Sequence, residues 1–357
     1  MTLIIAEAGV NHNGDYNLAK KLVDAAHIAG ADVVKFQTFT TKKLVTKNAQ
    51  QASYQSVNSG KTESQFDMLS RLELSYNDHH RLVAHCKKID IEFLSTAFDS
   101  ESLNFLVNDL KLSRLKIASG ELTNAPLVLE HAKTQCELIV STGMATLSEI
   151  ETALGVIAFG YTASATILPS LEAFSVAYAS EAGQRALRDK VTLLHCTTEY
   201  PAPIDEVNLR AMNTLKSTFG LVSGYSDHTV GINIPIAAAA LGAVIIEKHF
   251  TLDRNLEGPD HKASLEPGEL KAMISAIREV ELALGDGIKR PTQSEIKNKE
   301  VARKSIVAIC DIRKGEIFSV DNLAVKRPGT GKSPYLYWRV LGTQAKQDLK
   351  AGELIDE

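Results

Sequence analysis

The chain has 357 residues, of which 44% are hydrophobic and 23% charged, and its formal net charge is −4. This mixed, nearly neutral composition is typical of a globular protein and gives no reason to expect nucleic acid or a membrane surface as a partner. No apolar run approaches the ~20 residues that a membrane-spanning helix needs, and Glu7 comes too early for a secretory signal. Four widely spaced cysteines favour a reducing, cytoplasmic location.

Eight short apolar runs recur along the chain, and nearly every one ends in polar or charged residues. Continuous runs of Val, Ile and Leu are typical of buried parallel strands. The predicted strands are 3–6, 32–34, 91–94, 115–118, 137–140, 191–194, 221–224 and 243–246. Apolar residues at helical spacing predict helices at 17–29, 148–158, 208–218 and 266–284. Eight strand–helix units predict an α/β fold, a (β/α)8 TIM barrel with its chemistry at the carboxyl ends of the strands.

Two segments interrupt this alternation. Residues 40–72 form a long polar stretch after the second strand, which we predict to be a loop on the catalytic face. Residues 160–189 precede the sixth strand on the opposite face, and we predict a structural or subunit-contact insertion there. The expected domains are a catalytic barrel at 1–286, a linker at 287–300 and a small β-rich domain at 301–357.

His228 and His249 follow two consecutive predicted strands, so closure of the barrel brings them together. Neutral imidazole is the commonest metal ligand in proteins, and two histidines leave positions open for water and substrate. Glu247 lies two residues before His249, on the same side of an extended strand. The histidines could instead only hydrogen-bond to their neighbours, but the pair beside carboxylates favours a divalent metal site.

Lys35 follows the second predicted strand, and Lys116 lies within the fourth. Lysine is rarely buried unless it is paired, so two lysines at one barrel mouth predict an anionic ligand. Hydroxyl groups suited to bind phosphate or carboxylate oxygens lie nearby in Thr96, Ser119, Ser141 and Thr142. A neutral network with glutamates and a lysine Schiff base are the alternatives. Glu7 and Glu121 are candidates for proton transfer.

Longer motifs occur in order along almost the whole chain. They are EAGVNHNG at 7–14, VKFQT at 34–38, KIASGE at 116–121, STGM at 141–144, HCTTEYP at 195–201, GYSDHT at 224–229, EKHF at 247–250 and GPDH at 258–261. Together they resemble the bacterial sialic acid synthase family. The tail, with KRPGTG at 326–331, is similar to that family's C-terminal antifreeze-like (SAF) domain, a small β-clip fold.

The resemblance implies a transferase that condenses phosphoenolpyruvate with an open-chain N-acetylmannosamine-type sugar and releases phosphate by C–O cleavage. We predict N-acetylmannosamine as the acceptor, which would make the chain an N-acetylneuraminate synthase. The alternative acceptor is 2,4-diacetamido-2,4,6-trideoxymannose, which gives N,N'-diacetyllegionaminate. His228 and His249 are then expected to hold Mn²⁺ or Mg²⁺, which polarises the sugar aldehyde.

The resemblance also implies roles for the other site residues. The expected phosphoenolpyruvate ligands are Lys35, Thr96, Lys116, Ser119, Ser141 and Thr198. The residues expected to hold the sugar or move protons are Glu7, Gln37, Asn58, Glu121, Tyr200 and Asp260. Glu7, Glu121 and Lys116 are the expected catalytic residues. Arg327 matches the family's arginine that reaches from the C-terminal domain over the acetamido group in the partner's site, which implies a domain-swapped homodimer.

Three other interpretations compete with this one. A metal-dependent barrel hydrolase would use the histidines but would not obviously need the two lysines. A lysine Schiff-base aldolase would act on pyruvate without metal and would be trapped by borohydride. The tail could also be an ice-binding or interaction module, although the charged stretch at 311–316 argues against a flat, regular ice-binding surface.

Overall fold

The computed structural model describes residues 1–59 and 63–356. The chain divides into two compact units, Met1–Leu284 and Gly285–Glu357. In the described part of the chain, no helix combines the length and the apolar content needed to cross a membrane.

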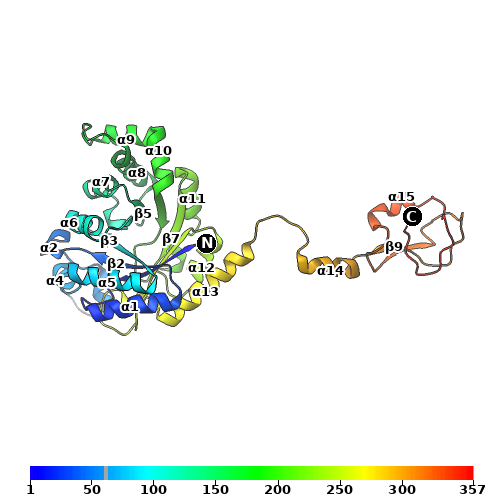
Figure 1. Cartoon of the computed structure of the whole chain (residues 1–357), viewed down its shortest axis with the longest axis horizontal. Coiled ribbons are helices and arrows are strands. Elements are labelled where there is room, and N and C mark those ends of the chain that lie inside the picture. Colours follow the sequence, from blue (N-terminus) through cyan, green and yellow to red (C-terminus); the bar gives the residue numbers. More distant parts are fainter. Residues whose placement is uncertain (60–62, 357) are drawn as a thin grey trace. The chain divides into compact units, whose positions relative to one another are not determined.

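The first unit is a closed barrel of eight parallel strands in sequential order, as predicted (Figure 1). The strands are β1 (Leu3–Gly9), β2 (Val33–Thr38), β3 (Glu92–Ala97), β4 (Arg114–Ile117), β5 (Glu137–Ser141), β6 (Val191–His195), β7 (Val222–Asp227) and β8 (Ile245–His249). In the strand register, Glu7 of β1 is opposite Lys35 of β2 on one side and His249 of β8 on the other. The closed register therefore gathers the polar strand ends around one axis.

Several strands extend beyond the apolar runs from which they were predicted. Glu7, Lys35 and Glu247 lie inside strands and are buried, although the pattern placed them just after the strands. Charged side chains are tolerated there because they pair with one another across the barrel interior. Hydrophobicity alone therefore underestimates the length of a strand that carries the site.

Helices surround the strands (Figure 1). The principal ones are α1 (Tyr16–Ala29), α5 (Tyr76–Ile89), α6 (Ser100–Asn104), α7 (Ala125–Lys133), α8 (Leu147–Thr162), α11 (Ala211–Phe219), α12 (Asn233–Ala240) and α13 (Pro267–Leu284). Local signals set their ends: the Asp15 carboxylate accepts the backbone N–H groups of Asn17 and Leu18, and Gly30 ends α1 with a left-handed φ of 88°.

The segment after β2 is more ordered than the predicted loop over 40–72. It contains α2 (Thr41–Leu44), α3 (Ser53–Ser59) and α4 (Gln65–Ser70), and only residues 60–62 lie outside the described part. Met68, Leu69 and Leu72 pack with Val10 and Phe39 in a small apolar cluster. The loop prediction was wrong because these few apolar residues, at helical spacing, are enough to fix short helices against the barrel.

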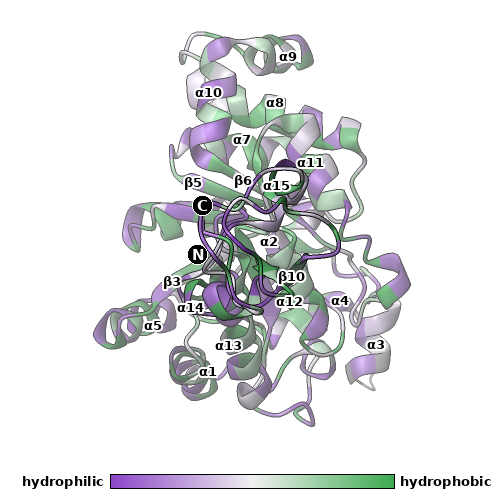
Figure 2. Cartoon of the chain, turned by 90° about the vertical axis from the view of Figure 1, so that its right-hand side faces the viewer, coloured by the Kyte–Doolittle hydropathy of each residue, from purple (hydrophilic) through white to green (hydrophobic). Residues whose placement is uncertain are grey.

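The segment 160–189 also forms helices, α9 (Leu171–Ala179) and α10 (Glu181–Lys190), which pack on α8 (Figure 2). Phe174 of α9 lies edge-on to Phe159 of α8, with ring centroids 5.2 Å apart. Ser170 and Ser180 cap the two helices through their side chains. A structural or subunit-contact role for this pair of helices stays a prediction.

The second unit contains α14 (Gln293–Ala302), the antiparallel strands β9 (Ser305–Ala308) and β10 (Leu323–Lys326), and α15 (Tyr337–Val340). Part of the predicted linker over 287–300 is helical, because Thr292 and Glu295 cap each other's backbone and start α14; the linker itself stays a prediction. Ile306, Phe318 and Leu323 belong to a small core of its own.

A buried histidine in α7 gives a testable link between pH and barrel stability. His131 is buried, and burial lowers its pKa below the usual 6.5. The unfolded chain therefore takes up a proton near pH 6.5 that the folded chain does not, so stability falls as pH falls below 6.5. We expect His131→Leu to reduce this loss by up to ~1.4 kcal/mol per pH unit, measured by urea unfolding at pH 7 and 5. Equal pH slopes for both proteins would contradict this.

Candidate active site

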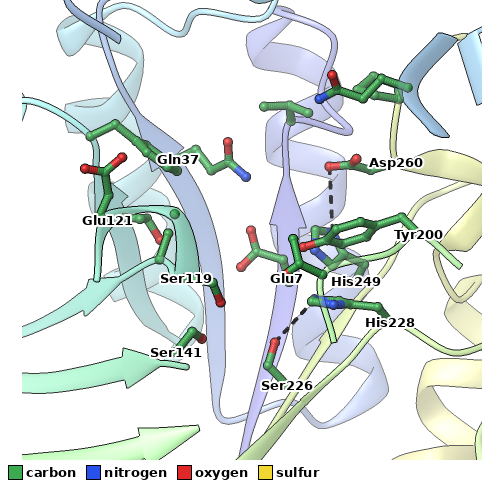
Figure 3. Close-up of a pocket in the computed structure, with 18 of the residues that line it drawn as sticks. Glu7, Gln37, Ser119, Glu121, Ser141, Tyr200, Ser226, His228, His249 and Asp260 are labelled. Carbon is green, nitrogen blue, oxygen red and sulfur yellow. Dashed lines mark hydrogen bonds and ion pairs between the residues drawn. The ribbon is translucent and has the colours of Figure 1, made fainter. Parts of the chain in front are cut away.

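A cavity of ≈ 280 Å³ opens at the carboxyl ends of the barrel strands (Figure 3). The predicted site residues that line it are Glu7, Lys35, Gln37, Thr96, Lys116, Ser119, Glu121, Ser141, Thr198, Tyr200, His228, His249 and Asp260. In Figure 3, Ser119 and Ser141 lie on one side of Glu7, and Tyr200, His228 and His249 lie on the other. Residues far apart in the sequence thus meet in one cavity.

The cavity floor is a network of two carboxylates and two ammonium groups. Lys35 forms an ion pair with Glu7, and its Nζ lies 3.6 Å from Glu247 Oε2. Lys116 Nζ lies 3.6 Å from Glu247 Oε1, and all four side chains are buried. The predicted alternative of a neutral lysine–glutamate network is therefore present, and the same residues also face the cavity.

The environments of these two carboxylates differ. Burial raises the pKa of Glu7 above its usual range, although the charge of Lys35 opposes the rise. Burial acts in the same direction on Glu247, but the charges of Lys116 and Lys35 outweigh it and lower the pKa of that residue. Glu247 is therefore the ionised partner of the lysines, and Glu7 is the carboxyl that takes up a proton more readily.

Hydroxyl groups line the side of the cavity formed by β4, β5 and β6. Ser119 Oγ accepts the Gly143 backbone N–H at 3.0 Å, and a Cβ at Gly143 would come within 2.8 Å of this oxygen. Only glycine leaves space for such a close approach. The hydroxyls of Ser141 and Thr198 are buried without hydrogen-bond partners among the described residues. Unpartnered donors beside Lys116 suit the oxygens of an anion.

His228 and His249 lie together at the ends of β7 and β8, with ring centroids 5.5 Å apart. His228 Nδ1 lies 2.6 Å from the Thr197 carbonyl, which only accepts, so Nδ1 carries the proton and Nε2 keeps its lone pair. Burial lowers the pKa of His228 to about 4 and that of His249 well below 6.5. Both rings are therefore neutral at pH 7, as metal ligation requires.

The donor set at these histidines fits a divalent metal with several open positions. His249 Nδ1 is buried without a hydrogen-bond partner among the described residues and lies 3.9 Å from Asp260 Oδ2. Within residues 1–59 and 63–356, no group of three or more His, Cys, Asp or Glu side chains is placed to hold a metal ion. Two imidazoles would thus leave water or substrate to complete the coordination, as in a catalytic rather than a structural site.

Tyr200 lies between the two histidines and α3. Its ring centroid is 4.1 Å from that of His228 and 4.9 Å from that of Tyr54. Asn58 does not line the cavity, because its side-chain amide donates to the carbonyls of Tyr200 (3.1 Å) and Pro259 (3.0 Å). Asn58 therefore ties α3 to the loops that carry Tyr200 and Asp260, although we expected it to contact the sugar.

Two further predicted residues have less central positions. Glu121 lies on the short 3-10 helix at Ser119–Glu121, where its carboxylate accepts from the Asn124 amide at 2.7 Å. Arg327 belongs to the second unit, where its Nε donates to the Ala302 carbonyl at 3.0 Å. The contact of Arg327 with a partner's site stays a prediction.

Sequence reasoning missed several lining residues, among them Ser226 and Tyr54. Ser226 Oγ donates to Glu247 Oε1 at 2.9 Å, which orients the carboxylate between the lysines. Its position two residues before His228 on one strand face was a usable signal, the same one that singled out Glu247. Tyr54 had no comparable signal, because it reaches the site from a short helix of the β2–α5 connection.

Comparisons with known proteins agree with this geometry. A NeuB family model matches residues 22–289, and a SAF domain model matches residues 303–357. An N,N'-diacetyllegionaminic acid synthase from Campylobacter jejuni is 52% identical over 356 residues, which cover 100% of this chain and 99% of the relative. A protein of the same name from Legionella pneumophila is 44% identical, covering 98% of this chain and 92% of the relative.

A solved structure extends the likeness to three dimensions. The crystal structure of an N-acetylneuraminic acid synthetase from Leptospira borgpetersenii, in complex with citrate, is 33% identical to the chain, with a TM-score of 0.67. The match covers 83% of this chain and 90% of that one. The predictions of a barrel enzyme with a SAF domain are thereby confirmed. The chain belongs to the NeuB family and ends in a SAF domain.

Proposed function

We propose that this enzyme condenses phosphoenolpyruvate with 2,4-diacetamido-2,4,6-trideoxymannose to N,N'-diacetyllegionaminate and phosphate. Relatives that are 52% and 44% identical over nearly the whole chain carry the name of that synthase. They favour this acceptor over N-acetylmannosamine, the acceptor predicted first. The observation in the site that best supports the proposal is a single cavity. It is lined by two buried lysines, by hydroxyls without a partner among the described residues, and by a pair of neutral histidines.

Phosphoenolpyruvate is assigned to the lysine and hydroxyl side of the cavity. Lys35 and Lys116 balance its negative charges, while Ser141 and Thr198 donate to its oxygens. The acceptor aldehyde is assigned to the histidine side, beside Tyr200 and Asp260. C3 of phosphoenolpyruvate then bonds to the aldehyde carbon, water adds at C2, and the C2–O bond breaks to release phosphate.

Glu7 is the residue best placed to handle a proton in this reaction. It lies between the two substrate sides in Figure 3, and its raised pKa lets it hold a proton that an ordinary carboxyl would lose. We assign it to protonation of the aldehyde oxygen as the new bond forms. A divalent metal held by His228 and His249 would supply Lewis-acid polarisation of the same aldehyde.

Phosphate release from phosphoenolpyruvate tests the proposal directly. The assay compares 2,4-diacetamido-2,4,6-trideoxymannose with N-acetylmannosamine, each with Mn²⁺, with Mg²⁺ and with EDTA. Metal-dependent release that prefers the diacetamido sugar supports the proposal, and a preference for N-acetylmannosamine restores the first prediction. If the folded protein releases no phosphate with either sugar, the proposal is refuted. Borohydride trapping with pyruvate would then identify an aldolase.

We further propose a cytoplasmic homodimer in which Arg327 of each chain contacts the acceptor in the partner's site. Arg327→Ala is then expected to raise the KM for the acceptor about tenfold or more, because a charged hydrogen bond is lost, and to change the KM for phosphoenolpyruvate far less. Steady-state kinetics on both substrates measure this split. Lys326→Ala, one residue earlier on β10, is the matched control. Equal effects of Arg327→Ala on both KM values would argue against an acetamido contact.

A further inference from the structure

One wall of the cavity is apolar, in contrast to its charged floor. We call it the acceptor wall and define it by the lining residues Leu44, Val45, Met68, Leu69, Leu72 and Phe98. These residues come from the segment after β2, with α2 and α4, and from the end of β3. Met68, Leu69 and Leu72 are at most 9% exposed and pack with Val10 and Phe39, so the wall is held in place before any ligand binds.

The wall and the two unpartnered hydroxyl groups follow different strands, although Lys35 of β2 also faces the cavity. Ser141 is the last residue of β5 and Thr198 follows β6, whereas the wall follows β2 and β3 in the closed strand order. An anion at the hydroxyls leaves the wall free for the other substrate. The wall side chains contain no oxygen or nitrogen, so a substrate hydroxyl that faces them loses water without gaining a partner there.

We propose that the acceptor wall selects sugars whose far end is apolar, by receiving the C6 methyl group and the methyl of the 4-acetamido group. This inference rests on the proposed function and names the part of the site that chooses among acceptors. Burial of one methyl group favours binding about fourfold. The C6 hydroxyl of N-acetylmannosamine would be left without a partner in the same place, which disfavours that sugar by a further tenfold or so.

Polar groups beside the wall fit the rest of such an acceptor. Gln37 and Gln65 line the same cavity, and their side chains are partly exposed. An amide side chain both donates and accepts, so it can pair with the N–H and the carbonyl of an acetamido group. The methyl carbons then point to the wall while the amide atoms stay paired.

A kinetic test of the folded wild-type enzyme with three acceptors distinguishes the contributions of the two methyl groups to kcat/KM. They are N-acetylmannosamine, 2-acetamido-2,6-dideoxymannose and 2,4-diacetamido-2,4,6-trideoxymannose. We expect kcat/KM to rise at least fourfold at the first step, where only the C6 hydroxyl is lost, and to rise again at the second. A first step that leaves kcat/KM unchanged or lowers it overturns the inference, even when phosphate release itself upholds the proposed synthase.

Variants locate the effect at the wall. Met68→Gln is expected to lower the preference for the 6-deoxy acceptors over N-acetylmannosamine about tenfold, whereas Met68→Leu keeps it within about threefold. Met212→Gln is the matched control, because Met212 is equally buried in α11 but does not line the cavity. Equal losses on all acceptors in Met68→Gln would overturn the assignment to the wall. If this variant does not fold, the wild-type series still decides.

Discussion

His228→Ala is expected to abolish metal-dependent turnover, with kcat/KM lower by at least ~10³-fold. The variant removes one of the two neutral imidazoles that face the aldehyde side of the cavity. Polarisation of a carbonyl by a metal contributes several kcal/mol to transition-state stabilisation, and each 1.36 kcal/mol is about tenfold in rate. Phosphate release at increasing Mn²⁺ measures the loss, and calorimetric titration of Mn²⁺ measures binding independently of turnover.

His195 provides the matched control for that experiment. It also ends a barrel strand, but its Nε2 pairs with the Val207 carbonyl at 2.6 Å and it does not line the cavity. His195→Gln should therefore keep the metal requirement and the affinity for Mn²⁺. Near-wild-type activity of His228→Ala, with metal still required, would remove His228 from the proposed ligand set.

Lys248→Met is expected to cost the barrel ~3–5 kcal/mol in free energy of unfolding. Lys248 Nζ lies 2.5 Å from Asp227 Oδ2, and both side chains are completely buried. The Tyr225 hydroxyl and the Thr229 backbone N–H also donate to this carboxylate, at 3.0 and 3.1 Å. Loss of the ammonium leaves a buried negative charge without its counter-ion, which is much less stable than a paired one. Urea unfolding of the wild type and the variant measures the difference.

A double variant separates the charge effect from simple loss of packing. Asp227→Leu combined with Lys248→Met removes both charges, so it should cost less than the sum of the single substitutions. Additive costs would show that the ion pair has no special role. The pair joins β7 to β8 one residue before each histidine, so the single variant should also weaken Mn²⁺ binding.

The sequence was sufficient to predict the barrel because its signal is repeated eight times. Each strand has its own short, mostly apolar run, and an error at one run would not change the topology. Residues such as Lys35 and His249 could be assigned to one site for the same reason, since parallel strands in a closed barrel must bring their ends together. The predicted fold was therefore enough to assign separate motifs to one site, although the sequence gives no distances between them.

The parts that could not be predicted depend on contacts between side chains. The helices α2, α3 and α4 are short, and contacts with residues distant in the sequence hold them: α2 and α4 pack with Val10 and Phe39, and Tyr54 of α3 packs against Tyr200. Asn58 pairs with two carbonyls from other loops, which no local pattern can indicate. The difference between Glu7 and Glu247 likewise arises from the lysines around each carboxylate, and the sequence does not contain those distances.

The residues proposed to select the acceptor are separate in this chain from those assigned to the reaction, because most of them lie in the connection between β2 and α5. The groups assigned to bond making lie on the strands and just after them, whereas most of the acceptor wall lies on this one connection. Evolution can therefore change the acceptor sugar by replacing one contiguous segment, without changing the residues assigned to the reaction. For the same reason, residues 39–75 are the segment to exchange between such enzymes when a different nine-carbon acid is wanted as the product.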